Sequence, residues 1–307
     1  MKILILGYSD LVQRKVIPAI KKFKGIKYDI ASKSKKEQNC GHEKWYRDYI
    51  DAIYKSNANI VYISLTNSLH FSYALKSLNS SKNVIVDKPI TLSLKQTKRL
   101  IKIARKKKLL ISEALVFNYH KQFLLIKKLI KKNKISLNNI IMQFCIPKPP
   151  KNNFKLSKIM GGGCFNDMSP YAAAVKRLFM GKKIKFIKVI SKHSNKLSEE
   201  FCLTVCSKKI NFIGIFSHNS EYKNDITFLA KSYLICAKRF SAPPANIDLV
   251  VNFRKKNKLK KLIVKKDDMF MNYLKEYFQK LKSKNFLYYQ DRILEDAKFI
   301  NKLKISK

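Results

Sequence analysis

The sequence predicts a two-domain protein of the α/β class, in which a parallel sheet is followed by an α+β domain built on an open, mostly antiparallel sheet. Residues 1–120 alternate apolar strand-like runs with segments of helical period, as parallel sheets with right-handed crossovers do. In residues 121–307, strand-like runs follow one another with turn signals and mostly without helices between them, which is typical of antiparallel sheets. A chain of 307 residues that is 46% hydrophobic can bury the cores of both domains.

In the first domain, strands are predicted where continuous apolar runs end at glycine or polar residues, as buried parallel strands do. These runs cover residues 2–7, 27–34, 60–68, 83–89 and 109–115. Helices are predicted where apolar residues recur with helical spacing, at residues 11–23, 70–81 and 94–108. This alternating order predicts that neighbouring strands are parallel.

In the second domain, the predicted strands are longer and are separated by turn signals. They cover residues 139–146, 184–194, 200–207, 209–218 and 225–240. Short connections of this kind join antiparallel neighbours. Two amphipathic helices are expected to close the chain, at residues 267–283 and 288–303.

The net charge of +45 raises the question of a nucleic acid or an anionic membrane as partner. Only eight of the 65 basic residues are arginine, the residue that reads phosphate and guanine by its planar fork. The lysines are scattered in runs such as 105–110, 126–134 and 253–262. This pattern favours a coding bias that fills solvated faces with lysine, so no specific nucleic-acid partner is predicted. A basic nucleic-acid binder is the alternative.

The cysteine pattern indicates a reducing compartment. The six cysteines form no CxxC pair, and their spacing suggests neither a disulfide framework nor a zinc site. A cytoplasmic protein without a metal is therefore predicted. The apolar run at residues 2–7 is too short for a spanning helix and lacks a cleavage-site pattern, so no membrane partner is expected.

The segment GYSDLV at residues 7–12 joins the first predicted strand to the first helix. Gly7, Ser9 and Val12 occupy the three positions of the dinucleotide fingerprint GxGxxG, in which small residues let a pyrophosphate approach the helix N-terminus. Ser9 is small enough for this approach, and its hydroxyl can add a hydrogen bond. The motif alone is weak, and a plain connection between strand and helix is the alternative.

The end of the second strand indicates which dinucleotide would bind. NAD sites place an Asp or Glu there, which binds the ribose hydroxyls. In this chain Ser32, Lys33 and Lys35 stand in that region, and they suit a 2′-phosphate that a carboxylate would repel. NADP(H) is therefore predicted as the cofactor, with NAD(H) as the alternative because lysine is frequent throughout the chain.

Lys88 is expected at the edge of the sheet where ligands bind. The following Pro89 restricts Lys88 to extended backbone and ends the strand. Lys88 therefore lies at the carboxyl end of a parallel strand, which is where open α/β sheets hold their ligands. A solvated lysine at a strand end is the alternative.

The segment GGGCFNDMSPY at residues 161–171 combines three glycines with an acid and a phenol. Asp167 and Tyr171 are separated by one helical turn and share one face of the predicted helix. Pro170 is expected in the first turn of that helix, where a residue without N–H is tolerated. A glycine hinge with a core tyrosine is the alternative.

Together these segments resemble the glucose–fructose oxidoreductase, inositol dehydrogenase and MocA superfamily. Members share a nucleotide loop, an NxxH segment, an EKP signature, a following EA strand, and a GGGxxxDxxxH or GGGxxxDxxxY segment. This chain carries all five in the same order, at residues 7–12, 67–70, 87–89, 113–114 and 161–171. It departs from the usual pattern at four positions: Ser9, Thr66, Asp87 and Asn118.

The resemblance implies a Rossmann-type NAD(P)-binding domain, followed by a domain for substrate binding and for assembly into a homo-oligomer, a dimer or tetramer, through its sheet. It implies cofactor contacts by residues of the nucleotide loop and of the strand ends: Gly7, Ser9, Asp10, Leu11, Ser32, Lys33, Leu65, Asn67, His70, Asp87 and Lys88. It also implies that Lys88, Asp167 and Tyr171 face the nicotinamide across a cleft. The three glycines would let backbone pass close to substrate or cofactor.

These three side chains suit hydride transfer at a carbonyl group. A free phenol has a pKa of about 10, and a nearby ammonium lowers that pKa. Tyr171 beside Lys88 can therefore donate a proton to the carbonyl oxygen as negative charge develops there. Asp167 would hydrogen-bond a substrate hydroxyl and hold its pose.

The protein is predicted to be an NADP(H)-dependent oxidoreductase that acts on CH–OH groups of a carbohydrate. The specific reaction predicted is the reduction of a keto group of a nucleotide-linked sugar. The form of the motif with tyrosine resembles that of glucose–fructose oxidoreductase, dimeric dihydrodiol dehydrogenases and nucleotide-sugar 3-ketoreductases. A dehydrogenase of a free sugar, inositol or a trans-dihydrodiol is one alternative. A non-catalytic NADP-binding regulator is another.

Overall fold

The computed structural model describes residues 1–34 and 36–306, so Lys35 lies outside the described residues. Two compact units are present: Met1–Leu115 with Phe270–Lys298, and Val116–Met269 with Phe299–Lys307. This division differs from the expected one, in which residues 121–307 form the second domain throughout. The reason is that the segment Phe270–Lys298 packs against the first sheet.

Helices α7 (Met269–Lys282) and α8 (Leu287–Ile305) supply this packing. The buried Tyr273 hydroxyl donates to Ser112 Oγ at 2.8 Å, inside the first unit. The Gln290 side-chain amide donates to the Leu109 carbonyl at 3.0 Å. On the other side of α7, the rings of Phe23 and Phe278 meet edge to face with centroids 5.2 Å apart. The C-terminal helices therefore complete the core of the first unit.

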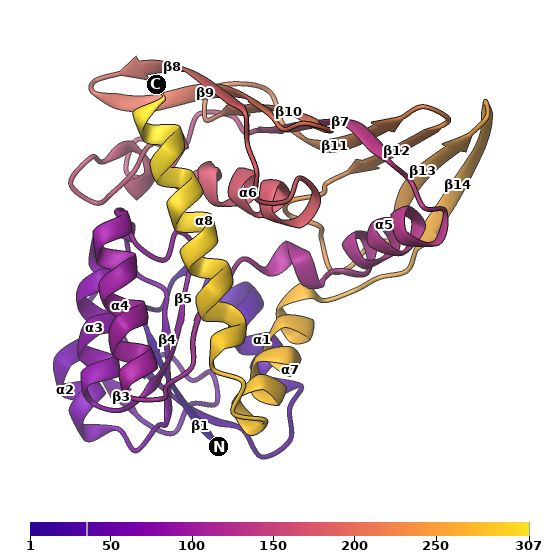
Figure 1. Cartoon of the computed structure of the whole chain (residues 1–307). Helices are drawn as coiled ribbons and strands as arrows, with labels where there is room; N and C mark the ends of the chain where they lie inside the picture. Colours follow the sequence, from indigo (N-terminus) through magenta and orange to yellow (C-terminus); the bar gives the residue numbers. More distant parts are fainter. Residues whose placement is uncertain (35, 307) are drawn as a thin grey trace. The chain divides into compact units, whose positions relative to one another are not determined.

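The first unit is a parallel sheet, as predicted, with the strand order β3-β2-β1-β4-β5-β6. Its strands are β1 (Lys2–Leu6), β2 (Lys27–Ala31), β3 (Trp45–Tyr46), β4 (Ile60–Ile63), β5 (Asn83–Val86) and β6 (Ile111–Glu113). Its other helices are α1 (Ile17–Lys21), α2 (Tyr49–Lys55), α3 (His70–Asn79) and α4 (Leu94–Lys106). α2, α3 and α4 lie on one face of the sheet, and α1 lies with α7 on the opposite face (Figure 1).

β3 and α2 were not predicted from the sequence. β3 is a two-residue strand at the sheet edge, too short to leave an alternating pattern. α2 has seven residues, and the Asp48 side chain caps it by accepting from the backbone N–H groups of Ile50 and Asp51. The first helix also begins with a wider turn, Val12–Val16, before α1.

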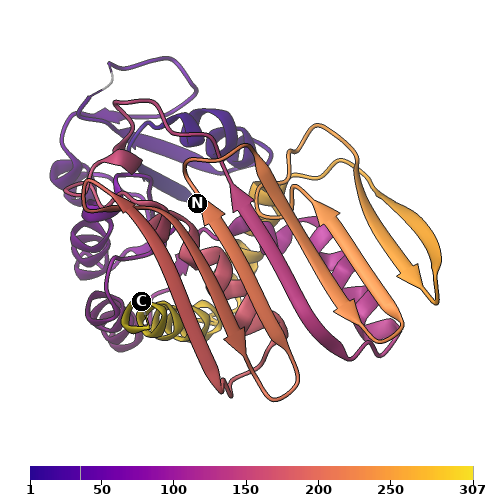
Figure 2. The ribbon, with the colours of Figure 1, turned by 90° about the horizontal axis from the view of Figure 1, so that it is seen from above.

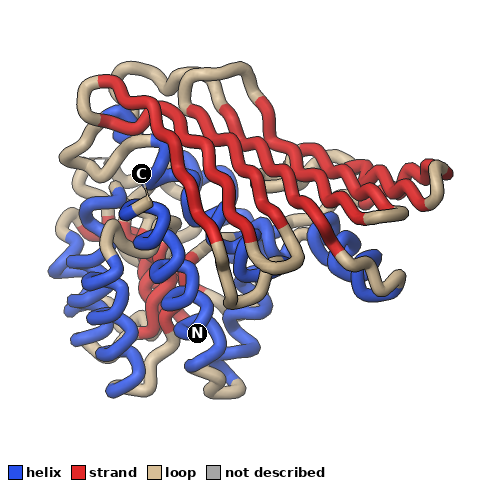
Figure 3. Tube along the Cα trace, turned by 45° about the horizontal axis from the view of Figure 1, so that its top comes forward, coloured by secondary structure: helices blue, strands red, loops and turns tan. Residues whose placement is uncertain are grey.

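The second unit is built on a mixed sheet of order β14-β13-β12-β11-β7-β10-β9-β8, in which only β7 and β10 pair in parallel. Figure 3 shows its strands as one continuous layer. The strands are β7 (Leu137–Cys145), β8 (Phe186–Ser194), β9 (Leu197–Cys206), β10 (Asn211–Ser217), β11 (Lys223–Ala230), β12 (Tyr233–Lys238), β13 (Leu249–Lys255) and β14 (Lys258–Val264). The mostly antiparallel sheet predicted for this part of the chain is confirmed.

Three features of this sheet were not predicted correctly. The run at residues 225–240 is two strands, because a turn at residues 231–232 folds it into the antiparallel pair β11 and β12. β13 and β14 were missed because the lysine run at residues 253–262 hides their alternation, and β14 is exposed along most of its length.

Helices α5 (Lys121–Lys132) and α6 (Cys164–Phe179) cover one face of this sheet, as Figure 2 shows. The side chains on that face are buried, among them Phe201, Phe212 and Phe228. The opposite face, here called the outer face, carries exposed apolar side chains that include Ile190 and Ile213.

Within residues 1–34 and 36–306, no helix has both the length and the apolar character needed to cross a membrane. The same residues contain no group of three or more His, Cys, Asp or Glu side chains arranged to hold a metal ion. All six cysteines are free thiols.

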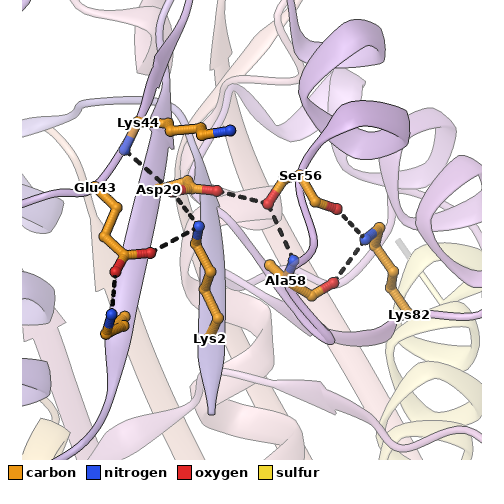
Figure 4. A network of polar contacts seen from close by, with 8 residues as sticks. Lys2, Asp29, Glu43, Lys44, Ser56, Ala58 and Lys82 are labelled. Atoms are coloured by element: carbon orange, nitrogen blue, oxygen red, sulfur yellow. Dashed lines mark hydrogen bonds and ion pairs between the residues drawn. The ribbon is translucent and has the colours of Figure 1, made fainter.

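A polar network near the amino ends of the first sheet's strands ties the sheet together (Figure 4). Its centre is the buried Asp29 carboxylate, which accepts from Ser56 Oγ at 2.7 Å and pairs with Lys2 at 2.9 Å. Lys2 and Lys27 also pair with Glu43, and these contacts hold the pKa of Glu43 down at about 2. Lys82 donates to the Ser56 and Ala58 carbonyls, and burial lowers its pKa.

We expect Asp29→Ala to lower the free energy of unfolding by about 3 kcal/mol, because it leaves the Ser56 hydroxyl without its buried acceptor and the Lys2 ammonium with Glu43 alone. Denaturant unfolding followed by circular dichroism measures the change. Asp51→Ala is the matched control, since Asp51 pairs with Lys55 on the exposed surface of α2 and should matter little. Equal losses in the two variants would contradict the central role of Asp29.

Candidate functional site

The strand register places three turns side by side at the carboxyl edge of the first sheet. The last paired residues of the three central strands lie in one row: Leu6, Ile63 and Val86. The next residues along the chain are Gly7, Ser64 and Asp87. Strand order reverses between β1 and β4, and open α/β sheets bind ligands at that point.

The Gly7 position requires glycine. Its φ is +95°, and a Cβ there would collide with the Ser64 carbonyl oxygen. The turn therefore keeps its backbone bare toward the sheet edge, which is what a pyrophosphate needs for close approach. Asp10 and Leu11 follow as exposed residues at the start of the helix. The N–H groups of a helix's first turn have no carbonyl partner within the helix, which is why helix starts suit anions.

The Ser9 hydroxyl is part of a hydrogen-bonded chain. Ser9 Oγ lies 2.9 Å from Ser64 Oγ and accepts from the Val12 N–H at 3.2 Å. Ser64 Oγ donates to one oxygen of Asp87 at 2.6 Å, and Tyr62 donates to the other at 2.7 Å. The enclosure of the Asp87 carboxyl raises its pKa, although these two hydrogen bonds act in the opposite direction.

At the end of β2, Ser32 is buried and its N–H donates to the Tyr46 carbonyl at 3.0 Å. The Lys33 ammonium pairs with Asp48 at 2.9 Å, and this contact holds the pKa of Asp48 down at about 2. Ala31 pairs with Tyr46, so the exposed Arg47 comes next to Ser32 at this edge. A 2′-phosphate here would meet a guanidinium as well as a lysine that already has a carboxylate partner.

His70 and its neighbours hold the turn after β5. The His70 ring is fully buried, with its nitrogens 2.7 Å from the Pro89 carbonyl and 3.0 Å from the Leu65 carbonyl. Burial lowers its pKa. Asn67 is also buried, in the short helical turn before α3. The structure thus gives His70 a positioning role, bracing the backbone on either side of it.

Lys88 comes two residues after the end of β5, at the carboxyl end of a strand as the sequence predicts, and it is half-buried. The Lys88–Pro89 peptide bond is cis. The Glu113 carboxylate accepts from the Ile90 N–H at 2.8 Å, so β6 supports the same turn. Lys88 belongs to the first unit, and Asp167 and Tyr171 belong to the second.

In the second unit, Asp167 and Tyr171 share one face of α6, as predicted. The prediction that Pro170 lies in the first turn of this helix is wrong. The helix begins at Cys164, capped by Gly163 with a φ of +96°, so Pro170 lies in its interior. Sequence alone did not show this start because the three glycines masked the cap.

The Asp167 carboxylate is held by two basic side chains. Its Oδ2 atom lies 2.9 Å from the Lys155 ammonium and 3.0 Å from His218 Nε2. Asp167 and His218 are both buried. The acid therefore has a defined position before any substrate binds. Tyr171 is half-buried, with ring contacts to Phe117 and Phe144 at centroid distances of 5.8 and 5.2 Å.

The three glycines serve the chain's own packing. A Cβ on Gly162 would collide with the Lys155 carbonyl oxygen, and it would lie 2.6 Å from the Phe154 carbonyl oxygen. The Gly163 N–H donates to that same Lys155 carbonyl at 2.8 Å. The Asn166 amide donates to the Gly161 and Gly162 carbonyls. This close approach is to backbone of the same unit, whereas the sequence resemblance implied an approach to substrate or cofactor.

Sequence reasoning missed several residues that the structure brings to these places: Tyr62, Ser64, Arg47, Asp48, Lys155 and His218. Lys155 and Arg47 are hidden by the abundance of basic residues. Ser64 could have been found, because the row of strand ends predicts a neighbour for Gly7 and Asp87. His218 has no local signal, since only the pairing of β10 with β7 and β9 brings it to α6.

Comparison with known proteins shows what the chain is similar to. A family model described as an oxidoreductase family with an NAD-binding Rossmann fold matches residues 1–115. The dTDP-3,4-didehydro-2,6-dideoxy-alpha-D-glucose 3-reductase of Actinomadura kijaniata is 21% identical over 287 residues, which covers 90% of this chain and 86% of that protein. A D-xylose 1-dehydrogenase (NADP(+)) of Hypocrea jecorina is 32% identical, over 30% of this chain and 24% of that protein.

The fold is also similar to a crystal structure of a 3-ketoreductase from Actinomadura kijaniata in complex with NADP and TDP-benzene. The TM-score is 0.92 at 19% sequence identity, and the match covers 100% of this chain and 97% of that chain. The fold class predicted from the sequence is thereby confirmed.

The glycine segment gives a direct prediction. Gly162→Ala should lower the free energy of unfolding by about 1–3 kcal/mol, because the added methyl group must displace the backbone at Phe154 and Lys155. Thermal and denaturant unfolding measure the loss. Gly25→Ala is the control for backbone strain alone, since its φ is +75° and nothing lies within 4 Å of the added carbon. A Gly162→Ala protein as stable as wild type would show that the segment relaxes freely.

Proposed function

Because the chain belongs to the glucose–fructose oxidoreductase, inositol dehydrogenase and MocA family of NAD(P)-dependent oxidoreductases, we propose that it uses NADPH to reduce a keto group of a nucleotide-linked sugar. The observation that carries this proposal is the Asp167–Tyr171 face of α6, where the half-buried Lys155 and the buried His218 hold the Asp167 carboxylate in place. The similarity to a 3-reductase over 90% of the chain supports the same substrate class.

The cofactor is proposed to bind at the carboxyl edge of the first sheet. The bare backbone of Gly7 would let the pyrophosphate approach the start of the helix at Asp10 and Leu11. Leu65, Asn67 and the turn at Asp87 and Lys88 would line the nicotinamide half of the site. These residues fit a dinucleotide, because the positive φ of Gly7 makes the tight, side-chain-free turn that the dinucleotide fingerprint requires.

The preference for NADPH over NADH is proposed to rest on the end of β2. Ser32 offers no carboxylate to the ribose, and Arg47 and Lys33 supply positive charge beside it. Arg47 is a second candidate for the 2′-phosphate, because Ala31 pairs with Tyr46 and this places Arg47 next to Ser32. Lys33 is paired with Asp48 at 2.9 Å.

For the chemistry, bound NADPH would supply the hydride that reaches the carbonyl carbon. Tyr171 is proposed to give its phenolic proton to the carbonyl oxygen as negative charge grows there. The Lys88 ammonium would favour the phenolate that remains and so assist the transfer. Asp167 would accept a hydrogen bond from a substrate hydroxyl, with Lys155 and His218 fixing the direction of its carboxylate.

We keep the proposal of a homo-oligomer formed through the outer face of the second sheet, which is supported by the exposed Ile190 and Ile213 side chains. The six free thiols agree with the proposed reducing, cytoplasmic compartment.

Oxidation of a free sugar is the second candidate function. It is favoured by the matched segment of a D-xylose 1-dehydrogenase.

The cofactor proposal predicts that Arg47→Ala weakens NADPH binding at least about tenfold, because hydrogen bonds to charged groups contribute about 1.5–3 kcal/mol. NADH binding should change little, and Ser32→Asp should shift preference toward NADH. Fluorescence titration of both cofactors at one salt concentration measures this. Arg99→Ala, an exposed arginine on α4, is the matched control. Tighter binding of NADH by the wild-type protein would refute the proposal.

The catalytic proposal predicts that Tyr171→Phe keeps the fold and the NADPH affinity but lowers turnover roughly 100- to 10,000-fold, because only the proton donor is removed. Lys88→Ala should fall in the same range, and the double variant should be little worse than either single one. Asp167→Asn should also raise the Michaelis constant for the sugar.

Steady-state kinetics with a panel of keto nucleotide sugars and free sugars, followed by NADPH absorbance, makes this measurement. Tyr54→Phe is the control, because this exposed tyrosine lies on α2. Retention of more than about a tenth of wild-type turnover in Tyr171→Phe, with chemistry rate-limiting, would show that Tyr171 is not the acid.

A further inference from the structure

A line of three hydrogen-bonded side chains connects the nucleotide loop to the turn that carries Lys88. Ser9 Oγ and Ser64 Oγ are 2.9 Å apart, and Ser64 Oγ is 2.6 Å from Asp87 Oδ2. The three residues come from three different turns, those after β1, β4 and β5. Their sequence separation is large, so only the sheet register brings them together.

Counting donors fixes the direction of these hydrogen bonds. An ionised carboxylate can only accept, so the Ser64 proton goes to Asp87. Ser64 Oγ is then the acceptor in its contact with Ser9, and the single Ser9 proton goes to Ser64. Ser9 Oγ also accepts from the Val12 N–H. With Asp87 ionised, the Ser9 hydroxyl has no proton left for a phosphate oxygen.

We infer that Ser64 is a positioning residue that links the nucleotide loop to the Lys88 turn and holds the Ser9 proton away from the cofactor phosphates. The inference rests on the proposed function only where it concerns turnover and cofactor binding. It corrects the reading of Ser9 as a phosphate donor. Ser9 instead stabilises the loop through its own hydrogen bonds. The pyrophosphate would then bind to backbone N–H groups at the start of the helix.

The second position of the nucleotide loop is Ser9, where the fingerprint GxGxxG has a glycine. A glycine at position 9 has no hydroxyl to donate to Ser64. The serine therefore supplies Ser64 Oγ with a donor that a glycine would leave missing, and Ser64 in turn donates to Asp87.

Several groups face the Asp87 carboxyl besides Ser64. Tyr62 from β4 donates to its other oxygen, and the electrostatic influence of His70 from α3 and of the adjacent Lys88 lowers its pKa. Burial acts in the opposite direction and is the largest influence. Removing the Ser64 hydroxyl removes one of the contacts that favour the ionised form, so the pKa of Asp87 rises further.

The first experiment is a double-mutant cycle of Ser9→Ala and Ser64→Ala in the protein without cofactor. Ser9→Ala should lower the equilibrium constant for folding about fivefold, which corresponds to one ordinary hydrogen bond. Ser64→Ala should lower it at least about tenfold, because it also loses the hydrogen bond to the Asp87 carboxylate. The fold-loss in the folding constant of the double variant should be smaller than the product of the two single fold-losses. The reason is that each single variant already removes the Ser9–Ser64 hydrogen bond. Ser72→Ala, whose hydroxyl donates to the Leu69 carbonyl on α3, is the matched control and should not couple to Ser9→Ala.

The second experiment follows NADPH affinity and the pH dependence of kcat. Ser64→Ala should move the acid limb of the kcat profile toward higher pH, since a hydrogen bond that favours the ionised form of Asp87 has been lost. Tyr62→Phe should move the limb in the same direction but leave the coupling between Ser9 and Ser64 intact. Ser9→Ala should change NADPH affinity less than about threefold, and Ser64→Ala should not weaken it.

Two outcomes would overturn the inference. One is additive losses in the stability cycle, which would show that Ser9 and Ser64 do not interact. The other is a tenfold or greater loss of NADPH affinity in Ser9→Ala with none in Ser64→Ala, which would make Ser9 a phosphate ligand. The stability cycle needs neither cofactor nor substrate, so it stands even if the proposed sugar reduction fails.

Discussion

The register of β1 with β4, and of β4 with β5, is the constraint on which the candidate site depends. It brings Gly7, Ser64 and Asp87 into one row at the carboxyl edge of the sheet. Gly7 can approach the Ser64 carbonyl because it has no side chain, and Ser64 can then reach Asp87 at 2.6 Å. A shift of the strand register by one residue would turn each side chain to the other face of the sheet, and these three residues would no longer lie side by side.

The residues at the amino ends and at the carboxyl ends of the first sheet's strands have different roles. At the amino ends, Asp29, Lys2 and Lys82 form a buried network in which each charge has defined partners. Such a network stabilises the sheet, since removing one partner leaves a buried charge uncompensated. At the carboxyl ends, burial raises the pKa of Asp87 and the backbone of Gly7 stays bare. Perturbed groups of this kind are concentrated where ligands are handled.

The second unit fixes its acid by a different route. Gly162 and Gly163 pack against the backbone at Lys155, and this packing brings the Lys155 ammonium to within 2.9 Å of Asp167. His218 reaches the same oxygen from the end of β10. The glycines thus act on Asp167 indirectly, through the loop they allow to fold close to α6. Tyr171 lies one turn further along, held by the rings of Phe117 and Phe144.

The sequence by itself determined the fold class, the resemblance to an oxidoreductase family and the positions of Lys88, Asp167 and Tyr171 on their elements, because hydrophobic periodicity and short motifs are local properties. It failed for β13 and β14, where lysines hide the alternation, and for Pro170, whose place depends on where α6 begins. Only the tertiary structure decided the partners. Ser64 with Ser9 and Asp87, Lys155 and His218 with Asp167, and Tyr273 with Ser112 are contacts between segments far apart in the chain. Strand register and packing select such contacts, and no local pattern encodes them.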